Sequence, residues 1–153
     1  MLAVLFCSGC TTAGAAQPKA VFRELKSGAY AASSSPAPQV ILAEDANAYR
    51  RIWGVLIGSG APPQADFSRE TAIFFLDRQR NTGGYSLEAR SVAMEGDTVI
   101  VKVTSHAPKS GSATAQVLTT PYTVIAVSGA AIHAARWVDA EHGAVVAESA
   151  KKP

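Results

Sequence analysis

Residues 71–76, Thr71-Ala72-Ile73-Phe74-Phe75-Leu76, and residues 80–85, Arg80-Asn81-Thr82-Gly83-Gly84-Tyr85, decide the fold of this chain. The first stretch is apolar at successive positions, which is typical of a strand covered on both faces near the centre of a sheet. The second stretch ends that run with two adjacent glycines. Glycine reaches positive φ without a Cβ clash, so this pair permits a sharp reversal or a close approach of another backbone.

Two interpretations of the double-glycine turn stay open at this point. In the first, it is a hairpin turn whose tyrosine packs into the core. In the second, it is a recognition loop, in which the glycines let a partner's backbone come close and the tyrosine anchors that partner. The candidate residues for partner binding, or for a structural turn, are Thr82, Gly83, Gly84, Tyr85 and Tyr122.

The segments around the turn predict a protein made mostly of strands. Apolar and polar residues alternate from residue 85 to 94, and the change of parity at Ser91-Val92 indicates a β-bulge. Glu95-Gly96-Asp97 is typical of a hairpin turn, and residues 98–104 alternate most clearly. Further strands are expected at residues 20–26, 40–42, 116–118, 122–127 and 132–138.

One amphipathic helix is expected between the second strand and residue 71. Asp45 is a favourable N-cap residue, and the apolar residues that follow recur at helical spacing on one face. These residues are Tyr49, Ile52, Trp53, Leu56 and Ile57, and the glycines and prolines at 58, 60, 62 and 63 end the helix. The predicted class is therefore α+β and β-rich, with a largely antiparallel, curved sheet and one helix packed on it.

Composition limits the function classes that this chain can belong to. Of its 153 residues, 48% are hydrophobic and 17% are charged. A chain of this length suits one domain with its own core. The formal net charge is only +2, which is too small for a nucleic-acid-binding surface, so no nucleic acid is expected as a partner. No apolar run approaches the roughly 18 residues of a membrane-spanning helix.

Catalytic and metal-binding patterns are also missing from the sequence. Three histidines, at 106, 133 and 142, are far apart and have no second ligand at metal spacing, so no metal or cofactor is expected. Ser112, His106 and Asp139 could be combined into a catalytic triad only by free choice, because no nucleophile motif surrounds the serine. Asp66 and Glu70 are expected to be a solvated pair. The sequence therefore predicts that the protein is not an enzyme.

The first ten residues, Met1-Leu2-Ala3-Val4-Leu5-Phe6-Cys7-Ser8-Gly9-Cys10, resemble a bacterial lipoprotein signal. In this interpretation Ser8 and Gly9 precede the cleavage site, and Cys10 becomes the lipid-bearing N-terminus. A redox pair of Cys7 and Cys10 is the rival interpretation, and an unmodified terminus is a third. The expected divisions are a signal segment at 1–9, a tether at 10–19, the folded domain at 20–139 and a polar tail at 140–153.

Several stretches, in order, are similar to the C-terminal domain of the protease complex subunit PrcB family. They are Asp66-Phe67-Ser68, Thr82-Gly83-Gly84-Tyr85-Ser86, Pro108 and Gln116-Val117-Leu118-Thr119-Thr120-Pro121-Tyr122. The resemblance covers roughly residues 20–138. It implies a bacterial surface lipoprotein, or a secreted domain, that assists the assembly or stability of a secreted protease complex, and it brings no catalytic residues with it.

We therefore expect a non-enzymatic, lipid-anchored interaction module of the bacterial cell envelope. Its lipid on Cys10 would hold it to a membrane, which is the outer membrane if the cell has one, because Thr11 is not the aspartate associated with inner-membrane retention. Its partner would be a protein, in particular a secreted protease. Two alternatives stay open: an envelope hydrolase of unrecognised type, and a structural envelope domain without a specific partner.

Overall fold

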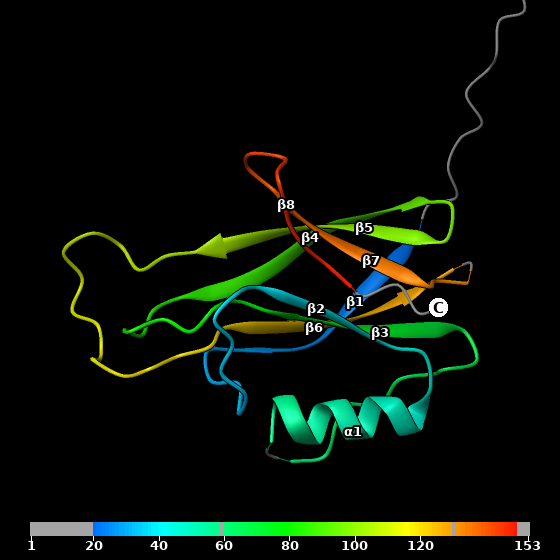
Figure 1. Cartoon of the computed structure of the whole chain (residues 1–153), viewed down its shortest axis with the longest axis horizontal. Coiled ribbons are helices and arrows are strands. Elements are labelled where there is room, and N and C mark those ends of the chain that lie inside the picture. The colour runs from blue at the N-terminus through cyan, green and yellow to red at the C-terminus, as the bar shows by residue number, and fades with distance from the viewer. Residues whose placement is uncertain (1–19, 59, 130, 150–153) are drawn as a thin grey trace, which may run out of the picture.

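The computed structural model describes residues 20–58, 60–129 and 131–149, and within them the chain forms eight strands and one helix (Figure 1). The elements are β1 (Val21–Gly28), β2 (Gln39–Ala43), α1 (Ala46–Leu56), β3 (Glu70–Leu76), β4 (Ser86–Glu95), β5 (Thr98–His106), β6 (Tyr122–Ser128), β7 (Ala134–Asp139) and β8 (Val145–Glu148). The described helix is too short to cross a membrane.

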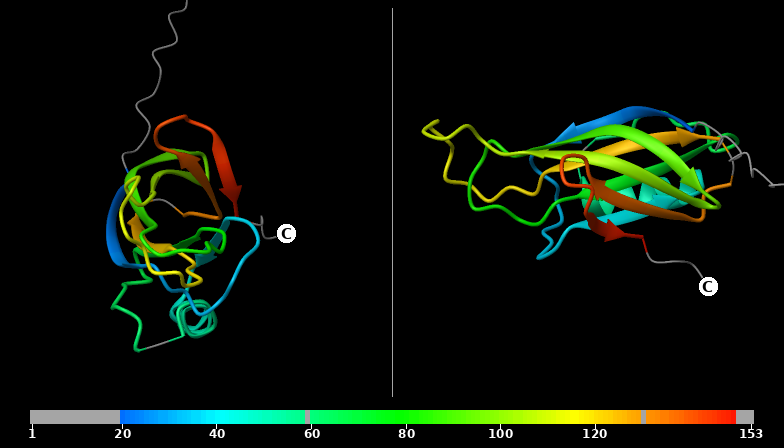
Figure 2. Two further views of the ribbon diagram at one scale, coloured as in Figure 1. Left: turned by 90° about the vertical axis from the view of Figure 1, so that its left-hand side faces the viewer. Right: turned by 90° about the horizontal axis from the view of Figure 1, so that it is seen from above.

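The strands divide into two four-stranded sheets, in the orders β1-β6-β3-β2 and β4-β5-β7-β8. The first sheet is antiparallel throughout, whereas the second contains one parallel pair, β5 with β7. Figure 1 shows three layers, with α1 under the first sheet and the second sheet above it. In the left view of Figure 2 the two sheets curve around a shared interior, and α1 lies outside it. The β-rich α+β class with a single helix is confirmed, but the strands form two sheets where we expected one.

The sequence of β3 explains why three layers are needed. Residues 72–76 are at most 1% exposed, so both faces of the strand require cover. Ile73 and Phe75 pack against the second sheet, where the Phe75 ring meets Trp137 edge-on at 5.9 Å between centroids. Phe74 faces the opposite way and contacts the ring of Trp53 on α1. An apolar residue at every position thus places β3 between a helix and a sheet.

Helix α1 forms as its sequence predicts. The Asp45 side chain accepts hydrogen bonds from the backbone N–H groups of Asn47 and Ala48, both at 2.8 Å. These bonds cap the first turn of the helix. Tyr49 and Trp53 are buried against the first sheet. The hydroxyl of Tyr49 donates to the carbonyl of Pro63 at 3.1 Å, and burial raises the pKa of Tyr49 to about 12.

Within the second sheet, the expected bulge is present. The register between β4 and β5 shifts between Ala89 and Ser91, where the alternation of the sequence changes parity. The hairpin between these strands turns at Gly96, whose φ is 62°. Glycine favours this conformation because it has no Cβ.

Three details of the sequence-based assignment are wrong. Residues 116–118 form no strand; among the described residues, pairing of this segment is limited to single bridges at Thr119 and Thr120. His133 precedes β7 and is not part of it. The segment expected to be a polar tail contains β8, which pairs with β7 through Arg136 and Trp137.

Candidate interaction surface

The double-glycine turn lies where the chain crosses from one sheet to the other. Strand β3 belongs to the first sheet and β4 to the second, so residues 77–85 do not form a hairpin, and that interpretation of the turn is wrong. The ends of β1, β3 and β5 and the starts of β2, β4 and β6 meet on this side. We call residues 29–38, 77–85 and 107–120 the loop end; in Figure 1 it extends beyond the sheets on the left.

Backbone hydrogen bonds fasten the turn to the long loop between β5 and β6. The N–H of Gly83 donates to the carbonyl of Ala115 at 2.9 Å. Arg80 and Thr119 exchange two backbone hydrogen bonds, at 2.7 and 3.0 Å, and the Thr119 hydroxyl donates to the carbonyl of Thr82 at 2.9 Å. Two segments about 35 residues apart in the chain therefore form one small unit.

Gly84 allows this unit to close. Its φ is 89°, and a Cβ built on it would lie 2.8 Å from the Cβ of Pro108 and 3.4 Å from the Cγ2 of Thr114. Real Cβ atoms essentially never approach as closely as 2.8 Å, so only glycine fits without a shift. The close approach that the glycine pair predicts is therefore made by the chain's own loop.

An ion pair between Arg80 and the buried Asp77 lies next to the turn. The Arg80 guanidinium contacts the Asp77 carboxylate through two nitrogens, Nε at 3.0 Å and Nη2 at 2.6 Å. Asp77 is 4% exposed, and its second oxygen accepts from the backbone N–H of Arg78. The same guanidinium lies 4.7 Å from the centre of the Tyr85 ring, which is a cation–π distance. Tyr85 is therefore half-buried beside an arginine and lies outside the main core.

Two neighbouring segments carry exposed apolar side chains. Tyr30 is 60% exposed, Leu118 58% and Val117 39%. Backbone hydrogen bonds between residue 120 and residues 29 and 31, at 2.9 and 3.1 Å, hold the two segments side by side. We call Tyr30, Val117 and Leu118 the loop-end patch. Large exposed apolar side chains on adjoining segments are candidates for an interaction site.

The predicted site residues separate into two groups. Thr82, Gly83, Gly84 and Tyr85 lie together at the loop end, next to the patch. Tyr122 is 5% exposed in β6, and its ring covers Gly28, where an added Cβ would lie 2.8 Å from the ring. Burial also raises the pKa of its hydroxyl. Tyr122 is thus a packing residue and presents no surface to a partner.

One predicted site residue lies outside the structure's described range, and two residues of the site were not predicted. Cys10, the predicted lipidation site, lies outside the described residues. Asp77 and Leu118 were missed by the sequence analysis. An aspartate three residues before an arginine, at the end of an apolar strand, is the one signal that could have indicated the buried pair.

Each of the three histidines lies beside a different carboxylate. His106 is 3.0 Å from Glu88, His142 is 2.9 Å from Asp139, and His133 is 3.6 Å from Glu44. Within residues 20–58, 60–129 and 131–149, no three potential metal ligands form a group.

The hydroxyl of Ser112 donates to the carbonyl of Lys109 at 2.6 Å, within its own loop. Ser112, His106 and Asp139, the three residues of the freely chosen triad, therefore each have a different partner.

Asp66 and Glu70 form a charged cluster with two arginines. Glu70 accepts from Arg23 at 2.8 Å and from the backbone N–H of Asp66 at 2.9 Å, and these bonds, that of Arg23 first, hold the pKa of the Glu70 carboxyl below its usual range. Hydrogen bonds from Ser68 and then Arg69 likewise lower the pKa of Asp66. Both carboxylates stay ionised at neutral pH; Glu70 ties the start of β3 to Arg23 of β1, whereas the Asp66 carboxylate bonds Ser68 and Arg69 in its own turn.

Comparison with known proteins identifies the family of the segment that contains the turn and the long loop, without residues 29–38 of the loop end. Residues 71–128 match the family model described as PrcB C-terminal, which confirms the resemblance that the motifs predicted. The matched segment runs from β3 to β6 and includes both central strands of the first sheet, the turn and the long loop. No curated protein and no solved structure matches the chain.

Proposed function

Because residues 71–128 match the PrcB C-terminal family, we propose that this chain is a non-enzymatic accessory protein that binds a secreted protease complex on the bacterial cell envelope. The family match supports a protein partner associated with a protease. The loop end supports the manner of binding.

The observation that carries this proposal is the combination of a fixed frame with exposed apolar side chains. Residues 80–85 and 115–119 are joined by four hydrogen bonds and rest on the Asp77–Arg80 ion pair. A surface that is already ordered loses little conformational entropy on binding, so its apolar contacts contribute more of their energy to affinity. The loop-end patch would supply those contacts, with Tyr85 beside them.

We also propose that the protein is anchored to a membrane by lipid on Cys10. Acyl chains partition into a bilayer with about 0.8 kcal/mol for each buried CH2 group, so a diacylated cysteine anchors stably. In a cell with two membranes the anchor would lie in the outer one. Residues 11–19 would then connect the anchor to the first strand.

The partner can be tested by affinity purification of the full-length tagged protein from native membranes. We expect a secreted protease to be recovered in stoichiometric amounts with the unchanged protein. Leu118→Asp should abolish this recovery, because it places a charge in the loop-end patch. Val21→Asp is a matched control, since Val21 is 64% exposed at the start of β1, at the opposite end of the first sheet from the loop end. Equal recovery with both variants, or no protease with the unchanged protein, would reject the proposal.

The anchor is tested separately. Cys10→Ala should release the protein from the membrane fraction and prevent labelling by a fatty-acid probe, whereas Cys7→Ala should change neither. If the Cys10→Ala protein stays in the membrane fraction after a carbonate wash, the anchor lies elsewhere.

A further inference from the structure

The charged side chains of the loop end are basic on balance. Its three segments contain three basic residues, Arg78, Arg80 and Lys109, and one acidic residue, Asp77. Asp77 is buried and lies 2.6 Å from Arg80, so these two charges neutralise each other. Arg78 and Lys109 are exposed, and neither forms an ion pair with a carboxylate of the described residues. The loop end therefore presents two unpaired cations to the solvent.

Carboxylates around the loop end bond to other groups. Asp139 lines a cleft of about 200 Å³ together with Arg78. Its Oδ1 atom accepts hydrogen bonds from two backbone N–H groups of its own turn, at 3.0 and 2.6 Å. Glu88, on β4, lies 2.9 Å from Arg90. These carboxylates are held by their own neighbours and leave the charges of the two cations available to a partner.

The two cations lie at the two ends of the double-glycine turn. Arg78 stands at its start, directly after the buried aspartate that follows β3. Lys109 stands near its other end, because it follows Pro108, the residue that a Cβ on Gly84 would meet at 2.8 Å. Leu118 of the loop-end patch lies on the segment that is hydrogen-bonded to the turn between these two ends. Apolar surface is thus flanked by a cation on each side.

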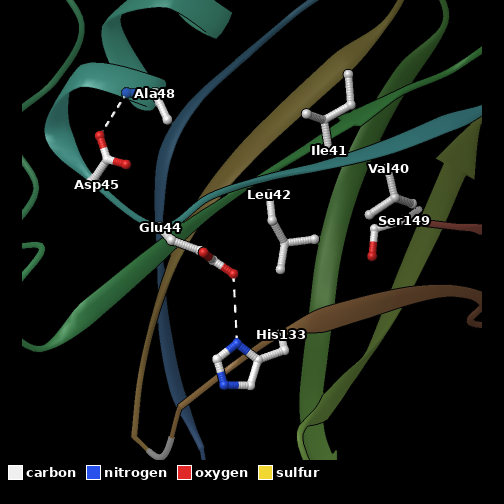
Figure 3. Close-up of a pocket in the computed structure, with 8 residues that line it drawn as sticks. All are labelled: Val40, Ile41, Leu42, Glu44, Asp45, Ala48, His133 and Ser149. Carbon is white, nitrogen blue, oxygen red and sulfur yellow. Dashed lines mark hydrogen bonds and ion pairs between the residues drawn. The ribbon is translucent and has the colours of Figure 1, made fainter. Parts of the chain in front are cut away.

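The opposite end of the strands has the reverse charge. Strands β2 and β4 end there, and β3 and β5 begin there. Residues 44–45, 66–70 and 95–97 contain one basic residue, Arg69, and six acidic ones: Glu44, Asp45, Asp66, Glu70, Glu95 and Asp97. Figure 3 shows Glu44 facing His133 at this end, with Asp45 at the start of α1. An acidic partner is therefore attracted to the loop end and repelled by the opposite end.

We propose that the loop end binds a segment of the protein partner in which apolar residues are flanked by aspartate or glutamate, with those carboxylates beside Arg78 and Lys109. The inference rests on the proposed function, because it takes the loop end as the binding surface. The apolar patch supplies most of the affinity, whereas the two cations speed association and select acidic segments over basic ones.

A cross-linking experiment tests which partner groups lie beside Lys109. The full-length tagged protein in native membranes is treated with a water-soluble carbodiimide, which joins a lysine amine to a carboxylate in contact with it and takes up the released oxygen as a urea. We expect Lys109 to be joined to an aspartate or glutamate of the recovered protease complex. Lys102 is the control, because it is an exposed lysine in the middle of β5, and it should not be joined. Mass spectrometry of the recovered complex identifies the linked residues.

Three outcomes of the cross-linking would overturn the inference. One is a recovered complex in which Lys109 carries no cross-link. Another is equal cross-linking of Lys102 and Lys109. The third is a cross-link from Lys109 to a carboxylate of a second copy of this chain, which would show that the basic loop end meets the acidic end of its own kind.

Charge variants measure what the two cations contribute. Rebinding of the recovered protease complex to the purified protein is followed with time at low salt. Arg78→Gln combined with Lys109→Gln should slow association about tenfold, and the difference should disappear above about 0.5 M NaCl, where charges are screened. Arg51→Gln combined with Lys102→Gln is the matched control, since it removes the same net charge from exposed positions on α1 and β5. Equal rates for the two double variants would overturn the inference.

The outcome separates this inference from the proposed function. If Leu118→Asp abolishes recovery of the protease but the loss of both cations changes no rate, the binding surface stands and the acidic partner is rejected. If the unchanged protein recovers no protease, both are rejected. Should the double variant not fold, Lys109→Gln alone decides, because Lys109 lies in a loop outside every strand. It should slow association about threefold at low salt, and an unchanged rate rejects the inference.

Discussion

The helix-covered face of the first sheet and the loop end are stabilised by different interactions. On the helix side, the rings of Tyr49, Trp53 and Phe74 contact one another and are almost fully buried. At the loop end, backbone hydrogen bonds and the Asp77–Arg80 ion pair hold segments whose apolar side chains remain exposed. The first region depends on apolar burial, so any substitution that shortens its buried side chains destabilises the fold. The second keeps its frame through the backbone, so its outward side chains can vary without loss of the fold.

The largest expected effect comes from the helix side. Phe74 is a fully buried ring between α1 and β3, and Phe74→Ala should lower the free energy of unfolding by about 3–5 kcal/mol. Leu118→Ala, in the loop-end patch, should lower it by less than about 0.5 kcal/mol, because that side chain is mostly in water. Urea denaturation of both variants checks the contrast. Similar losses for the two would show that the loop end is part of the core.

The ion pair should have the next largest effect. Arg80→Met leaves the Asp77 carboxylate buried without its partner and should cost about 3 kcal/mol. Arg78 is a neighbouring exposed arginine, and Arg78→Met should cost less than about 0.5 kcal/mol. Hydrogen exchange locates the effect: the Gly83 amide, bonded to Ala115, should lose protection in Arg80→Met alone. Unchanged protection of this amide would mean that the ion pair does not support the turn.

Gly84 and Gly96 form a matched pair that separates backbone strain from contact. Both have positive φ, 89° and 62°, but an added Cβ meets Pro108 at Gly84, and no described atom within 4 Å at Gly96. Gly96→Ala should cost about 1 kcal/mol through φ alone. Gly84→Ala should cost about 2 kcal/mol, because the long loop must also move. Thermal unfolding of both variants checks which substitution destabilises the protein more. Equal losses would mean that Pro108 moves away from the new Cβ at no cost.

The smallest effect concerns pH. In the folded protein the pKa of Glu70 lies below its ordinary 4.5, and the hydrogen bond from Arg23 is the main cause. A carboxyl with a lowered folded-state pKa stabilises the protein above its unfolded pKa, and this contribution is lost as the pH falls through the folded value. Arg23 is half exposed, so the contribution is less than about 1 kcal/mol. Arg23→Gln should flatten the loss of stability below about pH 4.5. A stability profile identical to that of the unchanged protein would show that Arg23 has no such role.

The same two regions differ in how far the sequence could predict them. Asp45 and the apolar spacing of α1 are local signals, and so are the double-sided apolar run of β3 and the parity change at Ser91. Each is decided by residues within one or two turns or strands, and each is confirmed. The arrangement of the loop end depends on which distant segments meet, and periodicity carries no information about that.

The errors have the same origin. The apolar residues at 117 and 118 suggest a strand, but a strand needs a neighbour, and within the described part of the chain the bridges form at the following threonines. Conversely, β8 is too short to be recognised from its sequence. It forms a strand by pairing with β7 at Arg136 and Trp137. The double-glycine pattern indicates a reversal of the chain but not which strands the reversal joins. A connection between two sheets and a hairpin within one sheet therefore have the same local sequence pattern.

The order in which the chain visits the two sheets has a consequence for its resistance to proteolysis. Residues 109–113 in the long loop are exposed, which is where a peptidase would cut first. Such a cut would leave β1 to β5 on one fragment and β6 to β8 on the other. Strand β6 would still sit between β1 and β3, and β7 beside β5, so each piece would complete a sheet of its counterpart. The nicked molecule would therefore stay assembled as two interlocked halves.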